Sequence, residues 1–174
     1  MTPNRIALLR GVNVGGNSRV PTAELKTLAA DLGLGAPATL LQSGNLVFAS
    51  DAAPLELEPM LEAAITARIG VSCAVLVRTA EQWRAALAAN PFTAAADVRP
   101  ATTLIFALRA RPSAEAEAKA RATFRGEEQL AVVGEHAYVD FGPSVGNSKF
   151  NPAKLGIATG RNWNTALKLA ALTA

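Results

Sequence analysis

The stretch TLLQSGNLVFA, residues 39–49, decides the fold. Its two apolar runs, 39–42 and 45–49, flank Ser43-Gly44, a dipeptide that is typical of a tight turn. Two strand-like runs joined by so short a link predict a β-hairpin. We therefore expect two neighbouring antiparallel strands here, and the elements before and after them define the rest of the sheet.

One strand and one helix are predicted on each side of this hairpin. The apolar run 6–9 predicts a strand, and Pro21 opens a helix whose leucines recur three and four residues apart. After the hairpin come a helix over 54–69 and an alternating strand over 71–78. This order of elements is ferredoxin-like, so we predict a first ferredoxin-like subdomain over residues 1–78.

The second half of the chain nearly repeats this order. Its predicted elements are a linking helix over 79–89, a strand over 102–108, a helix over 113–123 capped by Ser113, strands over 130–133 and 137–141, a polar loop over 142–150, a short helix from Asn151-Pro152 and a final helix over 162–172. No final strand is predicted, so the second ferredoxin-like subdomain, 79–174, is expected to be incomplete. The predicted fold class is α+β, with the two halves packed together.

The composition of the 174 residues excludes several classes of protein. Hydrophobic residues make up 50% of the chain and charged residues 18%, which excludes a disordered chain. No apolar run approaches the roughly 20 residues of a membrane helix, and the apolar run near the N-terminus is too short for a signal peptide. We therefore expect a cytoplasmic protein with no membrane partner.

The chain is poor in metal ligands and in disulfide-forming residues. It has one cysteine, Cys73, and one histidine, His136, whereas structural zinc takes four such ligands. Cys73 lies on the apolar side of a predicted strand, and we interpret it as a buried small hydrophobic residue. We expect no metal site and no cofactor, although a phosphate ligand could bring magnesium.

Two polar loops are the first candidate site. In an antiparallel ferredoxin-like sheet, the loop 11–17 and the turn 42–45 follow strand ends at the same edge, so they should be neighbours. Both are rich in residues that donate and accept hydrogen bonds or expose the backbone. The predicted ligand-binding residues here are Asn13, Gly15, Gly16, Gln42, Ser43 and Asn45.

The loop 11–17 has three interpretations. Gly11, Gly16 and Ser18 fit the pattern of a triphosphate-binding loop, but Asn17 stands where that pattern has lysine. The loop could instead cradle a smaller anion with its backbone N–H groups, or the glycines could simply supply a turn with positive φ. Arg10 and Arg19 flank the loop. Arg10 could bind a carboxylate or phosphate, or pair with Glu24 or another acid.

The second candidate group lies in the basic C-terminal segment. From Phe141 onward the chain has four basic side chains and no carboxylate side chain, within a formal net charge of +3. Lys149 and Arg161 are predicted to precede helices, where anions bind. Trp163 either stacks on a planar ligand or fills the core. The predicted residues of this group are Lys149, Arg161, Asn162, Trp163 and Asn164.

The segments LLRGVNVGGNSRVPTAEL, LLQSGNLVF and GRNWNTALKL together resemble a bacterial family of unknown function, domain-of-unknown-function family sixteen ninety-seven. The resemblance covers nearly the whole chain. It implies a compact α+β protein with ferredoxin-like parts and no established activity. The family usually has lysine at the position of Asn17. Its signature positions include Arg10 and Lys149 and otherwise fall in the loops described above.

The leading functional hypothesis is binding of a small anionic or polar ligand, phosphate- or nucleotide-like, at the Gly/Asn-rich loop, with Arg10, Lys149 and Arg161 supplying positive charge. The sequence does not decide between a binding protein and an enzyme, and it leaves the oligomeric state open. One alternative is nucleic-acid binding through the basic C-terminal segment, with affinity that falls steeply with salt. Another is a protein-interaction module without a ligand.

Overall fold

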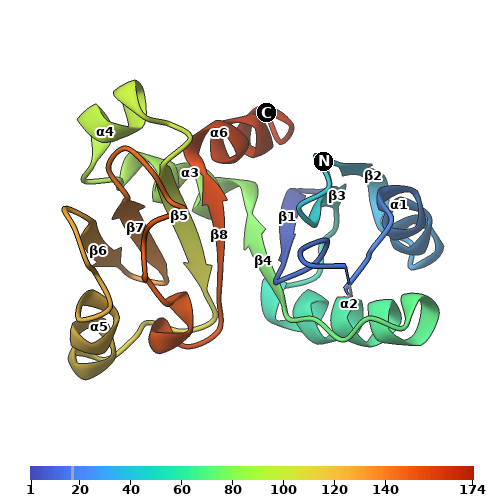
Figure 1. The fold of residues 1–174 in the computed structure, drawn as a ribbon. Coiled ribbons are helices and arrows are strands. Elements are labelled where there is room, and N and C mark those ends of the chain that lie inside the picture. The colour runs from blue at the N-terminus through green and yellow to red at the C-terminus, as the bar shows by residue number, and fades with distance from the viewer. Residues whose placement is uncertain (17) are drawn as a thin grey trace. The chain divides into compact units, whose positions relative to one another are not determined.

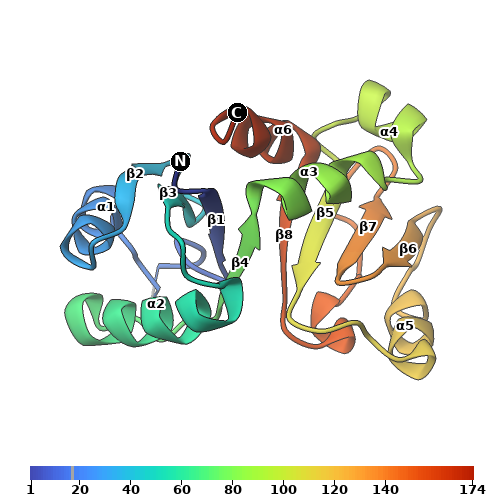
Figure 2. The same cartoon turned by 180° about the vertical axis from the view of Figure 1, so that it is seen from behind.

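The computed structural model describes residues 1–16 and 18–174, which divide into two compact units. The first unit comprises Met1–Arg84 and Leu169–Ala174, and the second comprises Ala85–Lys168. Each unit contains one four-stranded antiparallel sheet (Figures 1 and 2). Helices α3 (Ala80–Ala88) and α6 (Trp163–Ala171) each contain a boundary between the units.

The first unit has the ferredoxin-like order of elements. They are β1 (Asn4–Leu9), α1 (Thr22–Asp31), β2 (Gly35–Thr39), β3 (Asn45–Ala49), α2 (Pro54–Ile69) and β4 (Val75–Thr79). The strands lie in the order β2-β3-β1-β4, and all pairs are antiparallel. Apolar residues of α1 and α2, among them Leu28 and Leu61, form one core with alternate residues of the strands. The predicted ferredoxin-like fold of this half is confirmed.

The predicted first strand of the hairpin is wrong. We expected it at 39–42, but β2 ends at Thr39 and residues 40–44 form the connection to β3. Leu41 has φ 57°, a left-handed conformation outside the strand region, and its side chain is 53% exposed. Leu40 and Leu41 therefore have the hydrophobicity of strand residues, but their backbone belongs to the connection between β2 and β3.

The second unit has the same strand order. Its elements are α4 (Thr93–Val98), β5 (Thr103–Leu108), α5 (Ala114–Arg121), β6 (Gln129–Val133), β7 (His136–Asp140), a 3-10 turn η1 (Pro152–Leu155) and β8 (Ala158–Asn162). The sheet order is β6-β7-β5-β8. Ser113 caps α5 by accepting a hydrogen bond from Ala116 N at 3.1 Å, as expected. Residues of α5 and η1 pack with one face of this sheet.

The expectation that the second half has no final strand is wrong, because β8 pairs with β5 along its whole length. The sequence ATGRN lacks strand character, and it contains Gly160 opposite Phe106. A Cβ at Gly160 would lie 2.5 Å from the Phe106 ring, so the ring occupies the place of a side chain. What the second half lacks is a full second helix, which η1 replaces.

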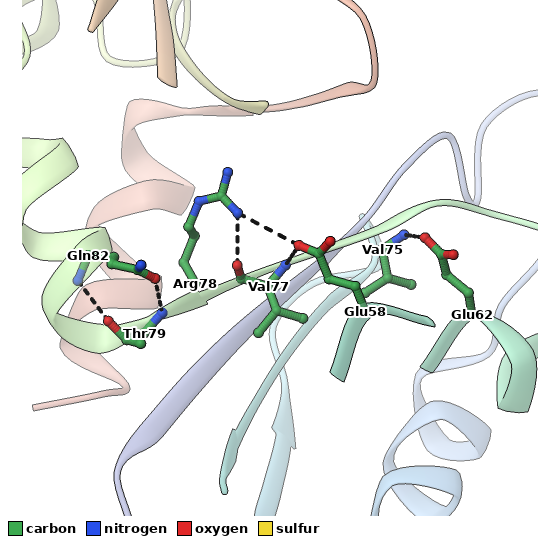
Figure 3. A network of polar contacts seen from close by, with 7 residues as sticks. All are labelled: Glu58, Glu62, Val75, Val77, Arg78, Thr79 and Gln82. Carbon is green, nitrogen blue, oxygen red and sulfur yellow. Dashed lines mark hydrogen bonds and ion pairs between the residues drawn. The ribbon is translucent and has the colours of Figure 1, made fainter. Parts of the chain in front are cut away.

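Strand β4, at the end of the first sheet, is bound by side chains of α2 (Figure 3). Glu58 and Glu62, one helical turn apart, accept hydrogen bonds from the N–H groups of Val77 and Val75, each at 2.9 Å. Arg78 Nη1 lies 3.8 Å from Glu58 Oε1, and both side chains are buried. Because these N–H groups point away from β1, the carboxylates satisfy donors that an edge strand otherwise leaves unpaired.

The start of α3 follows directly from β4 (Figure 3). Thr79 N donates to Gln82 Oε1 at 2.9 Å, and Gln82 N donates to Thr79 Oγ1 at 3.0 Å. This reciprocal pair is a capping box, which satisfies two donors that a helix start leaves free. The sequence T-x-x-Q therefore determines where α3 begins.

Candidate functional site

The two polar loops predicted at one sheet edge are joined by the side chain of Asn13. Its Nδ2 donates to Val20 O at 3.1 Å and also to Gln42 O, and its Oδ1 accepts from Val20 N at 2.9 Å. A second link runs from Leu9 N to Gly44 O at 2.8 Å. The predicted proximity of the loops is therefore confirmed.

The loops approach each other closely because Gly44 has no side chain. A Cβ on Gly44 would lie 2.5 Å from Val12 Cγ2 and 2.8 Å from Leu9 Cβ, and the residue has φ 73°. Asn13 also has a left-handed backbone, with φ 57°, which asparagine tolerates better than most residues. Both residues are therefore suited to their backbone positions.

A polar pocket of about 170 Å³ lies where these loops meet the start of α1. We call it the α1 pocket. It is lined by Asn13, Arg19, Val20, Pro21, Thr22, Ala23 and Gln42. Arg19 is exposed, and it contributes the only charged side chain among these lining residues.

The start of α1 adds backbone donors to this pocket. The N-cap residue is Pro21, which makes no side-chain capping hydrogen bond. The first N–H groups of a helix have no intrahelical acceptor, and the helix dipole makes this end positive. Thr22 and Ala23 belong to this first turn and line the pocket. The arrangement can therefore hold a small anion between a guanidinium group and a helix start.

Two predicted ligand-binding residues shape the turn itself. Asn45 is buried, and its Nδ2 donates to Leu40 O and to Ser43 Oγ, each at 2.8 Å. Its amide donors are thus used within the turn, and Ser43 is one of its partners. Neither residue lines the α1 pocket.

The other predicted residues of the first unit are Arg10, Gly15 and Gly16, and none of them lines the α1 pocket. Gly15 and Gly16 are exposed with φ 71° and 89°, which fits a glycine turn with positive φ. Arg10 is exposed at the end of β1, and its N–H donates to Ala74 O at 2.9 Å. Arg10 does not line the pocket, and the described residues show no ion pair between it and Glu24. Asn17, which was compared with the lysine of a triphosphate-binding loop, lies outside the described residues.

All residues of the predicted C-terminal group belong to the second unit. Arg161 lies in β8 and directly precedes Asn162, the residue before α6, so it precedes a helix as expected. Its Nη1 donates to Thr159 Oγ1 at 2.9 Å and to Gly160 O at 2.8 Å. Burial lowers the pKa of Arg161 to about 10, because the charged form loses hydration. Its bonding is that of a buried structural residue.

The other predicted residues of this group differ in their burial and in their contacts. Asn162 Oδ1 caps the helix by accepting from Thr165 N at 2.9 Å. Trp163 is 9% exposed, which fits the core-filling interpretation, whereas Asn164 and Lys149 are exposed. None of these residues is among those that line the α1 pocket.

Three residues that line the α1 pocket are not among the binding residues predicted from the sequence: Arg19, Thr22 and Ala23. A usable signal was present: a helix that starts at proline without Ser, Thr, Asp or Asn in the N-cap position leaves its first N–H groups uncapped.

The described residues offer little for metal or membrane binding. They contain no group of three or more His, Cys, Asp or Glu side chains that could hold a metal ion. No helix among them is long and apolar enough to cross a membrane. Cys73 is half-buried against the first core, and burial, with the nearby charge of Glu62, raises the pKa of its thiol.

A conserved bacterial protein from Streptococcus pneumoniae has a similar structure, with a TM-score of 0.77 and 20% sequence identity over the whole of both chains. No curated protein matches the chain. The family model described as a protein of unknown function, DUF1697, matches residues 2–138. Since this match spans most of the 174 residues, the chain belongs to the DUF1697 family.

Proposed function

We propose that this protein binds a small anion, a phosphate or carboxylate group of a metabolite, in the α1 pocket. The observation that carries the proposal is the convergence of Arg19 and the uncapped start of α1 on one pocket of about 170 Å³. This volume suits a single anionic group, and it is below the range of roughly 300 Å³ and more that is usual for sites enclosing whole drug-sized ligands. As the sequence led us to expect, we place this activity in the cytoplasm of a bacterium.

Each lining group has a role in this proposal. The Arg19 guanidinium donates to two oxygens of the anion, as planar guanidinium groups do with carboxylates and phosphates. The Thr22 and Ala23 N–H groups donate from the helix start. The Gln42 side chain contributes an uncharged donor, and Asn13 positions Gln42 through its hydrogen bond to the Gln42 carbonyl.

The first test compares two arginines that flank the same loop. Binding of inorganic phosphate, inorganic sulfate and ribose 5-phosphate is followed by thermal unfolding at low and high salt. A ligand at about 100 times its Kd adds about 2.7 kcal/mol of stability. Arg19→Ala should abolish this stabilisation, whereas Arg10→Ala should retain it because Arg10 lies outside the pocket.

The alternatives give different results in the same experiment. Stabilisation by short oligonucleotides alone, lost at high salt, would favour nucleic-acid binding through the basic C-terminal segment. No stabilisation by any of these compounds would favour an interaction module. Loss of phosphate binding in Arg10→Ala but not in Arg19→Ala would move the site away from the α1 pocket.

A further inference from the structure

A second pocket, of about 340 Å³, lies within the second unit, and we call it the loop pocket. It is lined by the segment 125–128, which leads into β6, and by residues between Phe141 and Ser148, which follow β7. Its volume is within the range that is usual for small-molecule sites, whereas the α1 pocket is below that range. The loop pocket therefore has room for a whole small molecule.

The loop 142–149, which forms one wall of this pocket, is closed at its base by aromatic rings. The rings of Phe141, just before the loop, and Phe150, just after it, contact each other with their centroids 5.8 Å apart. Phe150 also contacts Phe106 and Phe124, with centroid distances of 5.6 and 5.4 Å. A loop whose ends meet in this way has the geometry of an Ω-loop, a type that frequently carries function. Phe141 is 6% exposed and lines the pocket, so it supplies an apolar wall that is held in place.

Hydrogen bonds join the two walls of the loop pocket. Ser148 Oγ donates to Glu128 Oε1 at 2.8 Å, and Gly126 N donates to Glu128 Oε2 at 2.7 Å. Within the loop, Ser148 N donates to Val145 O at 3.1 Å. Because these contacts hold both walls before a ligand arrives, binding costs less conformational entropy.

The loop pocket has charged side chains of both signs. The Ser148 hydroxyl, which donates to Glu128, lowers the pKa of that carboxyl group, so Glu128 is ionised at neutral pH. A carboxylate has about four acceptor positions, so Glu128 can also accept from a ligand. Arg125 lines the same pocket with a guanidinium group, which binds carboxylates through two hydrogen bonds. Since Glu127 is a second acidic lining residue, the pocket favours a ligand with both charges over a simple anion.

We infer that the loop pocket binds a free α-amino acid with an apolar side chain. The carboxylate of the amino acid pairs with Arg125, and its ammonium group donates to Glu128. Its side chain packs on Phe141 and Pro143. This site lies in the other unit from the α1 pocket, and the inference does not rest on the proposed function.

The experiment measures the affinity of the protein for five compounds by calorimetry: L-leucine, L-leucinamide, N-acetyl-L-leucine, glycine and N-acetyl-L-leucinamide. L-leucine should bind saturably at one site. Leucinamide lacks the carboxylate, N-acetyl-leucine lacks the ammonium group and glycine lacks the apolar side chain, so each should bind about tenfold or more weakly. N-acetyl-leucinamide lacks both charges, as a residue within a peptide chain does, and should bind most weakly of the leucine compounds.

Two variants assign the two charges of the amino acid. Arg125→Ala should weaken the binding of leucine and leave that of leucinamide unchanged, because Arg125 contacts only the carboxylate. Glu128→Gln should weaken the binding of leucine and leave that of N-acetyl-leucine unchanged, and glutamine can still accept from Ser148. Arg111→Ala is the control, since Arg111 is exposed and does not line the pocket, and it should bind all five compounds as the unmodified protein does.

Arg19→Ala separates this site from the α1 pocket. Leucine binding should persist in this variant, and its loss would place the amino acid in the α1 pocket and overturn the inference. Absence of leucine binding in the unmodified protein would also overturn it. Equal affinities for leucine and N-acetyl-leucinamide would indicate a peptide segment instead and would refute the amino acid. The last two results leave the proposed binding of phosphate in the α1 pocket unchanged.

Discussion

Asn13 and Val20 hold each other through two hydrogen bonds: Asn13 Nδ2 donates to Val20 O at 3.1 Å, and Val20 N donates to Asn13 Oδ1 at 2.9 Å. The side-chain amide thus pairs with the Val20 backbone as a neighbouring strand would. The same Nδ2 reaches Gln42 O on the second loop. One side chain therefore fixes both polar loops and the approach of the chain to α1.

Asn13→Ala should destabilise the protein by about 2 kcal/mol, because it removes these bonds and places alanine in a left-handed conformation. Urea unfolding measures the change in the free energy of unfolding. Phosphate binding should weaken as well, since the pocket loses its geometry. Ser43→Ala is a suitable comparison, because Ser43 makes one hydrogen bond within the turn and should cost less. Equal costs would contradict the role assigned to Asn13.

Gly44→Ala should cost about 2–4 kcal/mol, because the new Cβ would lie 2.5 Å from Val12 Cγ2 in addition to the backbone strain at φ 73°. Gly134→Ala provides the control. Gly134 has φ 58°, but nothing lies within 4 Å of its Cβ position, so this variant should cost about 1 kcal/mol. Thermal or urea unfolding compares the two. A Gly44→Ala variant as stable as Gly134→Ala would contradict the close approach of the loops.

Glu58 and Glu62 make equivalent hydrogen bonds to β4 but differ in their surroundings. Glu62→Ala should cost about 1–2 kcal/mol, because it removes the hydrogen bond that Val75 N donates to Glu62. Glu58→Ala should cost about 3 kcal/mol or more, because it also removes the carboxylate that lies 3.8 Å from the buried guanidinium of Arg78. Urea unfolding of the two variants measures the difference. A smaller cost for Glu58→Ala than for Glu62→Ala would show that the ion pair does not stabilise the fold.

The raised pKa of Cys73 predicts a pH dependence of its reactivity. The thiolate is the nucleophile, and burial together with the negative charge of Glu62 favours the neutral thiol. Alkylation of the folded protein by iodoacetamide at pH 8 should be slower than that of the urea-unfolded chain, and it should accelerate only at higher pH than in the unfolded chain. Glu62→Gln should move this acceleration to lower pH. Equal rates in the folded and unfolded chains would contradict the environment described here.

The elements that sequence predicts well carry their own start and stop signals. Helix α2 spans Pro54–Ile69 as predicted, because proline lies at its start, apolar residues recur at helical spacing, and Gly70 ends it with φ 77°. The β6–β7 hairpin is marked by Gly134 in the same way. By contrast, β8 is a strand because Phe106 packs over Gly160, a relationship between distant residues that no local pattern reveals.

The same distinction applies to the candidate site. The proximity of the two polar loops follows from the predicted topology, and Asn13 and Gln42 do line the pocket. Whether an amide faces a ligand or the backbone depends on tertiary contacts, so Asn45 could not be assigned to the turn beforehand. The sequence likewise predicts that Arg161 supplies positive charge to a ligand, whereas the residue is buried in β8.

The central claim is that an anion binds at the start of α1 beside Arg19. The most direct test is to titrate ¹⁵N-labelled protein with inorganic phosphate and to record the chemical shift of each backbone amide by NMR. The account predicts saturable shifts that are largest at Thr22 and Ala23, and their loss in Arg19→Ala. Shifts concentrated at Lys149 and Lys154, or no saturable shift at Thr22 and Ala23, would contradict it.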